Sequence, residues 1–189
     1  MENKTDYDAL LAILKKRLNE KRYYHSLCVA DEAKRLAVKY GADPEKAYLA
    51  GLLHDITKNA PDEEHLKIFK DFGIILSDVE KNAKKLWHAM SGAAYAEHIL
   101  GINDPEIIDA IRYHTTAKAD MSLLAKILYL ADFTSADRDY EDVDVIREYV
   151  DISLEKAFIY ALQYSIKDLV DLQKAVHIDT VAAYNQAVL

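Results

Sequence analysis

The stretch Ala50-Gly51-Leu52-Leu53-His54-Asp55-Ile56 places a histidine and an aspartate directly behind an apolar run. Adjacent side chains on a helix point about 100° apart, so one metal ion can bind both of them only near a helix end or in a deep cleft. A charged aspartate among apolar neighbours is costly to bury unless it is paired or bound to a metal. The dipeptide is therefore a candidate metal site. Taken alone, however, it is more simply interpreted as a His-Asp pair that binds no metal.

Four further polar residues fall on the apolar faces of other predicted helices. His25, His88 and His114 each share a face with apolar or small residues three or four positions away, and Asp132 ends the apolar run 127–131. Each of them alone is most simply a core histidine or a capping aspartate. Their recurrence on separate helices is hard to explain by chance, and imidazole nitrogens with carboxylate oxygens are the ligand set of Fe, Mn, Zn, Co or Ni.

The other three histidines do not share this pattern. His65 lies among charged residues, and His98 follows Glu97 late in its predicted helix. We expect both to be solvated, because their neighbours are polar. His177 falls in the link before the last predicted helix, and the pattern alone assigns it no role.

A helical period of 3.6 residues recurs along most of the chain. Asp43-Pro44 and Asp104-Pro105 combine a helix cap with a proline at the first helical position, and Thr5 can cap a first helix. The pattern predicts an all-α, single-domain protein of about nine helices, at about residues 10–18, 23–40, 43–53, 63–72, 77–100, 107–114, 121–131, 153–176 and from 180. The acidic stretch 137–144 is the one candidate for a functional loop.

Composition supports a helical and cytoplasmic protein. Among 189 residues, 51% are hydrophobic and only five are glycine and three proline, which is too few for many sheet turns. The formal net charge of −8 argues against nucleic acid as a partner. No stretch reads as a signal peptide or a membrane span, and the single Cys28 suits a reducing cytoplasm.

The order His25, His54-Asp55, Asp132 resembles the HD-domain superfamily of metal-dependent phosphohydrolases. The segments AGLLHDITK (50–58), HAMSGA (88–93), AIRYHTT (110–116) and MSLLAKILYLAD (121–132) are similar to its bacterial YqeK-type branch. The resemblance covers about residues 21–185. It implies an HD-domain helical bundle within a single domain over 1–189. The metal-binding core would span about 21–138, and helices at 150–189 would pack on it and close the nucleotide site.

Members of this branch are symmetrical bis(5′-nucleosyl)-tetraphosphatases, which split diadenosine tetraphosphate into two ADP. The resemblance implies one or two metal ions, iron first, with manganese, cobalt or zinc as alternatives. It assigns the metal ligands to His25, His54, Asp55 and Asp132. It also implies that His88 and His114 face the phosphates or a second metal, that Lys58 and Arg138 contact phosphate, and that Thr180 and Asn185 line the nucleoside end.

The reaction implied is hydrolysis by metal-activated water attacking phosphorus. Lys58 and Arg138 would stabilise charge on the phosphate oxygens, and His88 or His114, where not a ligand, would donate a proton to the leaving group. Asp55, Lys58, His88 and His114 are thus the expected catalytic residues. The expected substrate contacts are His25, Asp55, Lys58, His88, His114, Arg138, Thr180 and Asn185.

The chain departs from the YqeK-type pattern outside the metal ligands. Thr134-Ser135-Ala136 replaces a usual Ile-Glu-Pro run, Ala89-Met90 a usual Gly-Pro, and Tyr184 a usual arginine. Since no expected metal ligand is lost, these departures concern the contacts with the nucleotide.

Three other functions remain open from the sequence. A different HD-type phosphohydrolase, such as a nucleotidase or cyclic-nucleotide phosphodiesterase, would use the same metal site. A regulatory protein would bind nucleotide and metal without turnover, and a helical interaction module would need no metal. The expected partner is a nucleotide polyphosphate, with no nucleic acid and no membrane, and a homodimer is compatible with the sequence.

Overall fold

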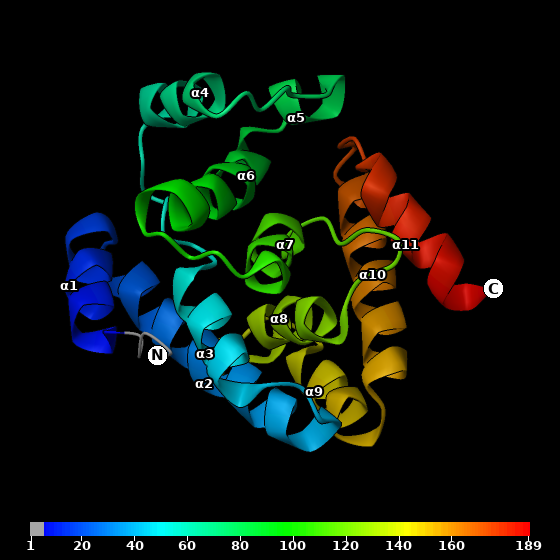
Figure 1. Ribbon diagram of the computed structural model, residues 1–189. Coiled ribbons are helices and arrows are strands. Elements are labelled where there is room, and N and C mark those ends of the chain that lie inside the picture. The colour runs from blue at the N-terminus through cyan, green and yellow to red at the C-terminus, as the bar shows by residue number, and fades with distance from the viewer. Residues whose placement is uncertain (1–5) are drawn as a thin grey trace.

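The computed structural model describes residues 6–189, which contain eleven α-helices, two short helical elements and no strand (Figure 1). The α-helices are Tyr7–Arg17 (α1), Glu20–Tyr40 (α2), Pro44–Leu53 (α3), Asp62–Asp71 (α4), Asp78–Asn82 (α5), Trp87–Ala94 (α6), Pro105–Tyr113 (α7), Leu123–Thr134 (α8), Val143–Ile152 (α9), Leu154–Asp171 (α10) and Ile178–Val188 (α11). The 3-10 helix η1 spans Lys84–Leu86 and the π-helix η2 spans Tyr95–Ile99. The all-α prediction is confirmed. Thr5, the expected first cap, lies outside the described residues, and the Asp6 side chain caps α1.

Two local features raise the helix number from the expected nine. The helix expected over 77–100 is interrupted at Ala83, where φ is −114° and ψ is 68°, and is divided into α5, η1, α6 and η2. Part of the acidic stretch 137–144 begins α9, which buries Val143, Ile146 and Val150. Their spacing of three and four residues is that of an amphipathic helix, and the surrounding acidic residues obscured it.

Helix α8 lies in the middle of the molecule, between α2 and α3 on one side and α10 on the other (Figure 1). Most of its residues are buried, including the run Ile127–Ala131. A helix that is apolar all round must be covered on every side. Since Asp132 directly follows that run, the packing of α8 determines the position of the Asp132 carboxylate.

A close approach of α2 and α3 depends on Gly51. A Cβ atom at this position would lie 2.5 Å from the Ala30 Cα, which is backbone and cannot move aside. Glycine therefore lets the end of α3, with His54 and Asp55, lie beside the part of α2 that carries His25.

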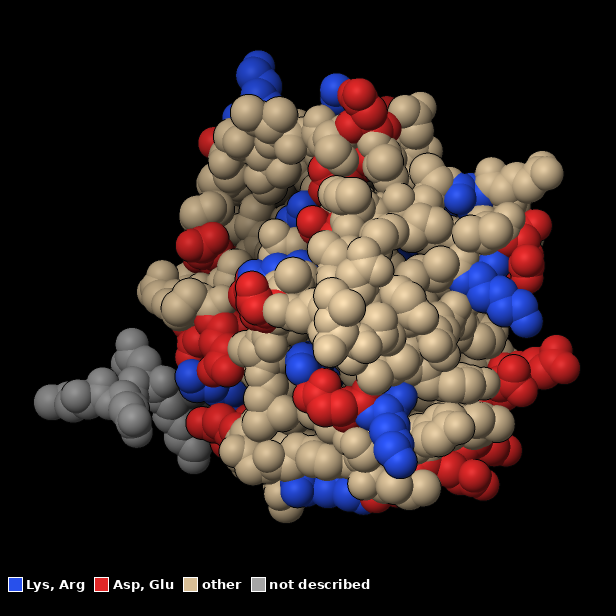
Figure 2. Space-filling view, turned by 90° about the vertical axis from the view of Figure 1, so that its right-hand side faces the viewer, with Lys and Arg blue, Asp and Glu red and all other residues tan. Residues whose placement is uncertain are grey.

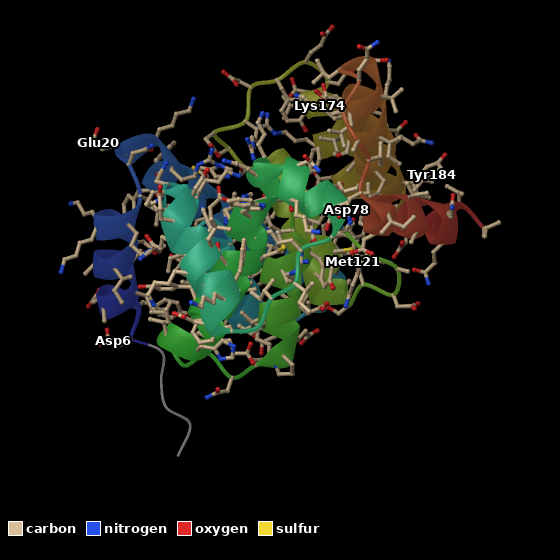
Figure 3. All side chains as sticks on the ribbon, turned by 90° about the horizontal axis from the view of Figure 1, so that it is seen from above. Asp6, Glu20, Asp78, Met121, Lys174 and Tyr184 are labelled. Atoms are coloured by element: carbon tan, nitrogen blue, oxygen red, sulfur yellow. The ribbon has the colours of Figure 1, made fainter. Side chains whose placement is uncertain are left out.

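The last three helices cover α8 from the other side, with α9 and α10 packed against it and α11 against α10. Seen from above, α5, which begins at Asp78, lies near α11, which bears Tyr184, while Lys174 lies in the link between α10 and α11 (Figure 3). The division into a core at 21–138 and closing helices at 150–189 stays a prediction. None of the described helices combines the length and apolar character needed to cross a lipid bilayer.

Candidate metal centre and active site

Helix α3 ends at Leu53, and the chain turns tightly through residues 54–59. The Ile56 amide donates to the Leu53 carbonyl at 3.1 Å, and the Lys58 amide donates to the Asp55 carbonyl at 2.8 Å. Both side chains of the His-Asp pair can bind one metal ion only near a helix end or in a deep cleft, and here α3 ends directly before the pair. The expected end of this helix near Leu53 is confirmed, so Lys58 follows in the turn and does not lie on the same helix as Gly51 and Leu53.

Three histidines present the same ring nitrogen to the site. His54 Nδ1 donates to the Gly51 carbonyl and His114 Nδ1 to the Ile111 carbonyl, each at 2.7 Å. Because a carbonyl only accepts, the neutral rings carry their proton on Nδ1 and leave a lone pair on Nε2. His25 Nδ1 lies 2.8 Å from an Asp137 carboxylate oxygen and is oriented in the same manner. An acceptor that holds the outer ring nitrogen is the usual arrangement around a metal-ligating histidine.

Asp55 stands at the centre of these rings. Its Oδ1 lies 3.1 Å from His88 Nε2 and 3.8 Å from His114 Nε2. Its Oδ2 lies 3.4 Å from His54 Nε2 and 3.9 Å from His25 Nε2. Both carboxylate oxygens therefore face imidazole nitrogens on either side.

Asp132 closes the group from α8. Its Oδ1 lies 3.0 Å from His25 Nε2 and 4.0 Å from His54 Nε2. The structure thus brings together four histidines and two aspartates that come from five separate helices or helix ends. Ligand atoms within 4.8 Å of one another form three overlapping sets, which are His25, His54 and Asp55; His54, His114 and Asp132; and Asp55, His88 and His114.

Two buried polar atoms in this group have no hydrogen-bond partner within the protein, His54 Nε2 and Asp55 Oδ1. His54 is fully buried and Asp55 is 1% exposed, so bulk water does not satisfy them. An unsatisfied buried polar group costs about 1–3 kcal/mol. A cation seated between these atoms removes that cost, and the donor set suits a transition metal.

The electrostatics keep the carboxylates charged and two of the imidazoles neutral. Burial alone would raise the pKa of Asp55, but its electrostatic interactions with the surrounding imidazoles, His54 first, outweigh burial and hold this pKa well below its usual range. Burial lowers the pKa of His88 to about 4 and also lowers the pKa of His114. An ionised carboxylate and a neutral imidazole are the protonation states that metal ligation requires.

Cationic side chains stand at both ends of the group. Lys58 Nζ lies 2.9 Å from His88 Nε2 and 3.5 Å from Asp55 Oδ1. At the other end, Arg138 donates to the Asp132 carboxylate and, at 2.6 Å, to the Asp132 carbonyl. Both expected phosphate-binding residues are therefore adjacent to the cluster.

Sequence reasoning missed two residues that touch the site. Arg22 Nη1 donates to Asp55 Oδ2 at 2.6 Å, and Asp137 orients His25. Arg22 lies three residues before His25 on one helix, so its i−3 spacing was an available signal. Asp137 lies in the acidic stretch singled out as a functional loop, but its particular partner depends on how that loop folds.

His65 is buried in the structure. The expectation that it is solvated is wrong, because it is only 6% exposed, its Nδ1 lies 2.7 Å from Ser91 Oγ, and its ring packs against Trp87. The buried face of α4 consists of His65, Ile68 and Phe69, at spacings of three and four, which face a small second core. His98 is exposed as expected, and His177 caps α11 and is buried.

Cavities open at the two ends of the cluster. A cavity of about 480 Å³ at the Lys58 and His88 end shares Lys84 and Lys85 with a larger one of about 730 Å³. The larger cavity lies between the α5–η1 segment and the C-terminal helices, and Thr180 lines it. A third cavity, of about 220 Å³, touches Asp132 and Arg138 at the other end.

The larger cavity contains the second group of unpartnered polar atoms, Thr115 Oγ1, Thr116 Oγ1 and His177 Nε2. Four lysines and no acidic residue line it, within a chain of net charge −8. The expected Asn185 is exposed on α11 and does not line this cavity. Figure 2, which looks onto α10 and α11, shows acidic and basic side chains interspersed around a broad uncharged area.

Comparisons with known proteins agree with this geometry. The HD domain family model matches residues 22–137. The symmetrical bis(5′-nucleosyl)-tetraphosphatase of Bacillus subtilis is 35% identical over 93% of this chain and 94% of its own length. The enzyme of the same name from Halalkalibacterium halodurans is 36% identical over 95% of each chain. A crystal structure described as a predicted HD superfamily hydrolase involved in NAD metabolism, from Clostridium acetobutylicum, superimposes with a TM-score of 0.94 at 38% identity over 97% of each chain.

Proposed function

This chain belongs to the HD domain family, and on that premise we propose that it is a metal-dependent hydrolase that cleaves dinucleoside tetraphosphates symmetrically. The YqeK-type resemblance implies diadenosine tetraphosphate as the substrate and two ADP as the products, and two Mycoplasma relatives whose names include Ap4A hydrolase support adenosine as the nucleoside. The observation that carries the proposal is the buried group of histidines and aspartates around the unpartnered His54 Nε2 and Asp55 Oδ1.

The residues that would hold a first metal ion are His25, His54, Asp55 and Asp132. His88 and His114 would hold a second ion together with Asp55. Asp55 belongs both to the set with His25 and His54 and to the set with His88 and His114, which supports a carboxylate shared by two ions. Iron is the metal that the YqeK-type resemblance implies, and manganese, cobalt and zinc suit the same donors. When bound, such an ion makes hydroxide available near neutral pH by acidifying water.

The chain's own cations would orient the phosphates. Lys58 and Arg138 flank the cluster, so a tetraphosphate laid across it meets a positive charge on each side. Attack of hydroxide on one of the two central phosphorus atoms breaks the bridging P–O bond, whose electron pair leaves with the second ADP. Charge that builds on the oxygens during this step is stabilised by Lys58 and Arg138.

One nucleoside would occupy the 730 Å³ cavity. Thr180 donates through Oγ1 to the Thr116 carbonyl at 2.7 Å, so it shapes the wall and has no hydroxyl proton to spare for a ligand. The unpartnered hydroxyls of Thr115 and Thr116 are better placed to bind a nucleoside. A contact from Asn185 stays a prediction of the resemblance, and a homodimer stays compatible with the sequence.

Product analysis tests the proposed function. With metal supplied, diadenosine tetraphosphate is expected to yield ADP alone, because attack at a central phosphorus leaves two phosphates on each adenosine. A mixture of ATP and AMP would contradict symmetrical cleavage. Orthophosphate from mononucleotides, or hydrolysis of a cyclic nucleotide in preference to the dinucleotide, would favour one of the other phosphohydrolases. Tight nucleotide binding without any product would favour the regulatory protein.

A further inference from the structure

The cluster of metal-ligand candidates extends as a row between two cations. From one end to the other, successive atoms lie 2.9 Å (Lys58 Nζ to His88 Nε2), 3.1 Å (His88 Nε2 to Asp55 Oδ1), 3.9 Å (Asp55 Oδ2 to His25 Nε2) and 3.0 Å (His25 Nε2 to Asp132 Oδ1) apart, and Arg138 follows Asp132. The 480 Å³ cavity opens at the Lys58 end, and the 220 Å³ cavity opens at the Arg138 end. The row therefore has a hollow at each end.

The two hollows differ in chemistry. At the Lys58 end, lysines lead into the larger cavity with its unpartnered threonine hydroxyls. At the Arg138 end, three aromatic rings line the cavity beside Asp132 and Arg138: Phe133 from α8, Tyr140 from the loop before α9, and Tyr164 from α10.

The aromatic rings form an ordered group. Ring centroids lie 5.4 Å apart for Tyr140 and Tyr164, and 6.4 Å apart for Phe133 with each of them. The Tyr140 hydroxyl donates to the Phe133 carbonyl at 3.1 Å, which holds that ring in place. All three rings are half-buried, so their remaining faces border the cavity.

We propose that this aromatic cavity is the subsite for the second nucleoside of the substrate, with the purine base against Tyr140 and Tyr164 and the adjoining phosphate on Arg138. The inference rests on the proposed function. A substrate cut at its centre has two halves that leave the scissile bond in opposite directions, so a nucleoside in the 730 Å³ cavity requires a place for the other beyond Asp132 and Arg138. Aromatic side chains stack on any base, because every base has a π-face.

The test compares a substrate with two nucleosides and a ligand with one. Diadenosine tetraphosphate fills both subsites, whereas adenosine 5′-tetraphosphate carries a single nucleoside, which the larger cavity takes. Tyr164→Leu keeps apolar volume but removes the ring, and is expected to raise KM for the dinucleotide about 10-fold, since one base stack is lost. The KM or inhibition constant of adenosine 5′-tetraphosphate is expected to change by less than about twofold.

Two variants on α10 serve as controls. Tyr164→Phe keeps the ring and is expected to retain the wild-type KM. Tyr160→Ala removes a tyrosine one turn away that does not line the 220 Å³ cavity, and it is expected to leave the dinucleotide KM unchanged. Circular dichroism melting establishes that each variant is folded.

The outcomes separate the two proposals. An unchanged dinucleotide KM in folded Tyr164→Leu, or an equal rise for both ligands, overturns the second subsite while symmetrical cleavage stands. Wild-type protein that releases no ADP from the dinucleotide overturns the proposed function itself. A rise for the dinucleotide alone supports both.

Discussion

Replacing Asp55 with alanine is expected to remove bound metal and lower kcat for ADP formation by at least about 1,000-fold. The Asp55 carboxylate lies within 4 Å of four histidine Nε2 atoms, and no other carboxylate of the described cluster lies that close to His88 or His114. Without it, neutral imidazoles and Asp132 must hold the ion alone. The measurements are metal content by mass spectrometry and steady-state ADP formation.

A control for this substitution is Asp71→Asn, which removes an exposed ion pair with Lys67 on α4. It is expected to keep wild-type metal content and turnover, because exposed pairs contribute little. Since Asp55 also pairs with Arg22, circular dichroism of the Asp55→Ala protein must show an intact helical fold. A folded Asp55→Ala protein with full metal and full turnover would refute the site.

Replacing Lys58 with methionine is expected to lower kcat/KM about 30- to 1,000-fold while metal content stays unchanged. The Lys58 ammonium lies beside His88 at the entrance of the 480 Å³ cavity, where it can meet a phosphate oxygen. Loss of one charge-assisted contact to the transition state costs about 2–4 kcal/mol. Methionine keeps the length of the side chain, so the change isolates the charge.

Lys67→Met, on the exposed surface of α4, is the matched control for Lys58 and is expected to have no effect. Arg138→Met removes a charge at the other end of the cluster, but Arg138 also donates to the Asp132 carboxylate and carbonyl. Its loss is expected to lower both kcat/KM and metal affinity. Unchanged kcat/KM in the Lys58 variant would show that this lysine belongs to the solvated surface.

The metal-ligand candidates could be predicted because they are polar or charged residues at positions where the helical pattern expects buried apolar side chains. His54-Asp55 follows an apolar run, and Asp132 ends one that packs in the centre of the molecule. Polar groups so placed need a partner, and imidazole with carboxylate limits that partner to few chemical classes. Side-chain type and helical period were therefore sufficient to select residues that the fold brings together.

Other features depend on tertiary packing that helical period does not encode. His65 has charged neighbours in sequence, yet its helix face covers a small core with Trp87. Lys58 reaches Asp55 through the tight turn after α3, and the helical period does not predict the geometry of that turn. The aromatic cavity unites residues from α8, a loop and α10, so no single stretch of sequence contains it.

The most direct measurement of the central claim is ADP formation from diadenosine tetraphosphate as stripped protein is titrated with iron(II) or manganese(II). Metal-free protein is expected to form no ADP, and the rate of ADP formation is expected to rise with bound metal until it saturates at one or two ions per chain. His54→Ala, which lacks a buried ligand with an unpartnered Nε2, is expected to bind less metal and to recover little activity. Equal ADP formation by metal-free and metal-loaded wild-type protein would contradict the claim that this cluster is a metal-dependent active site.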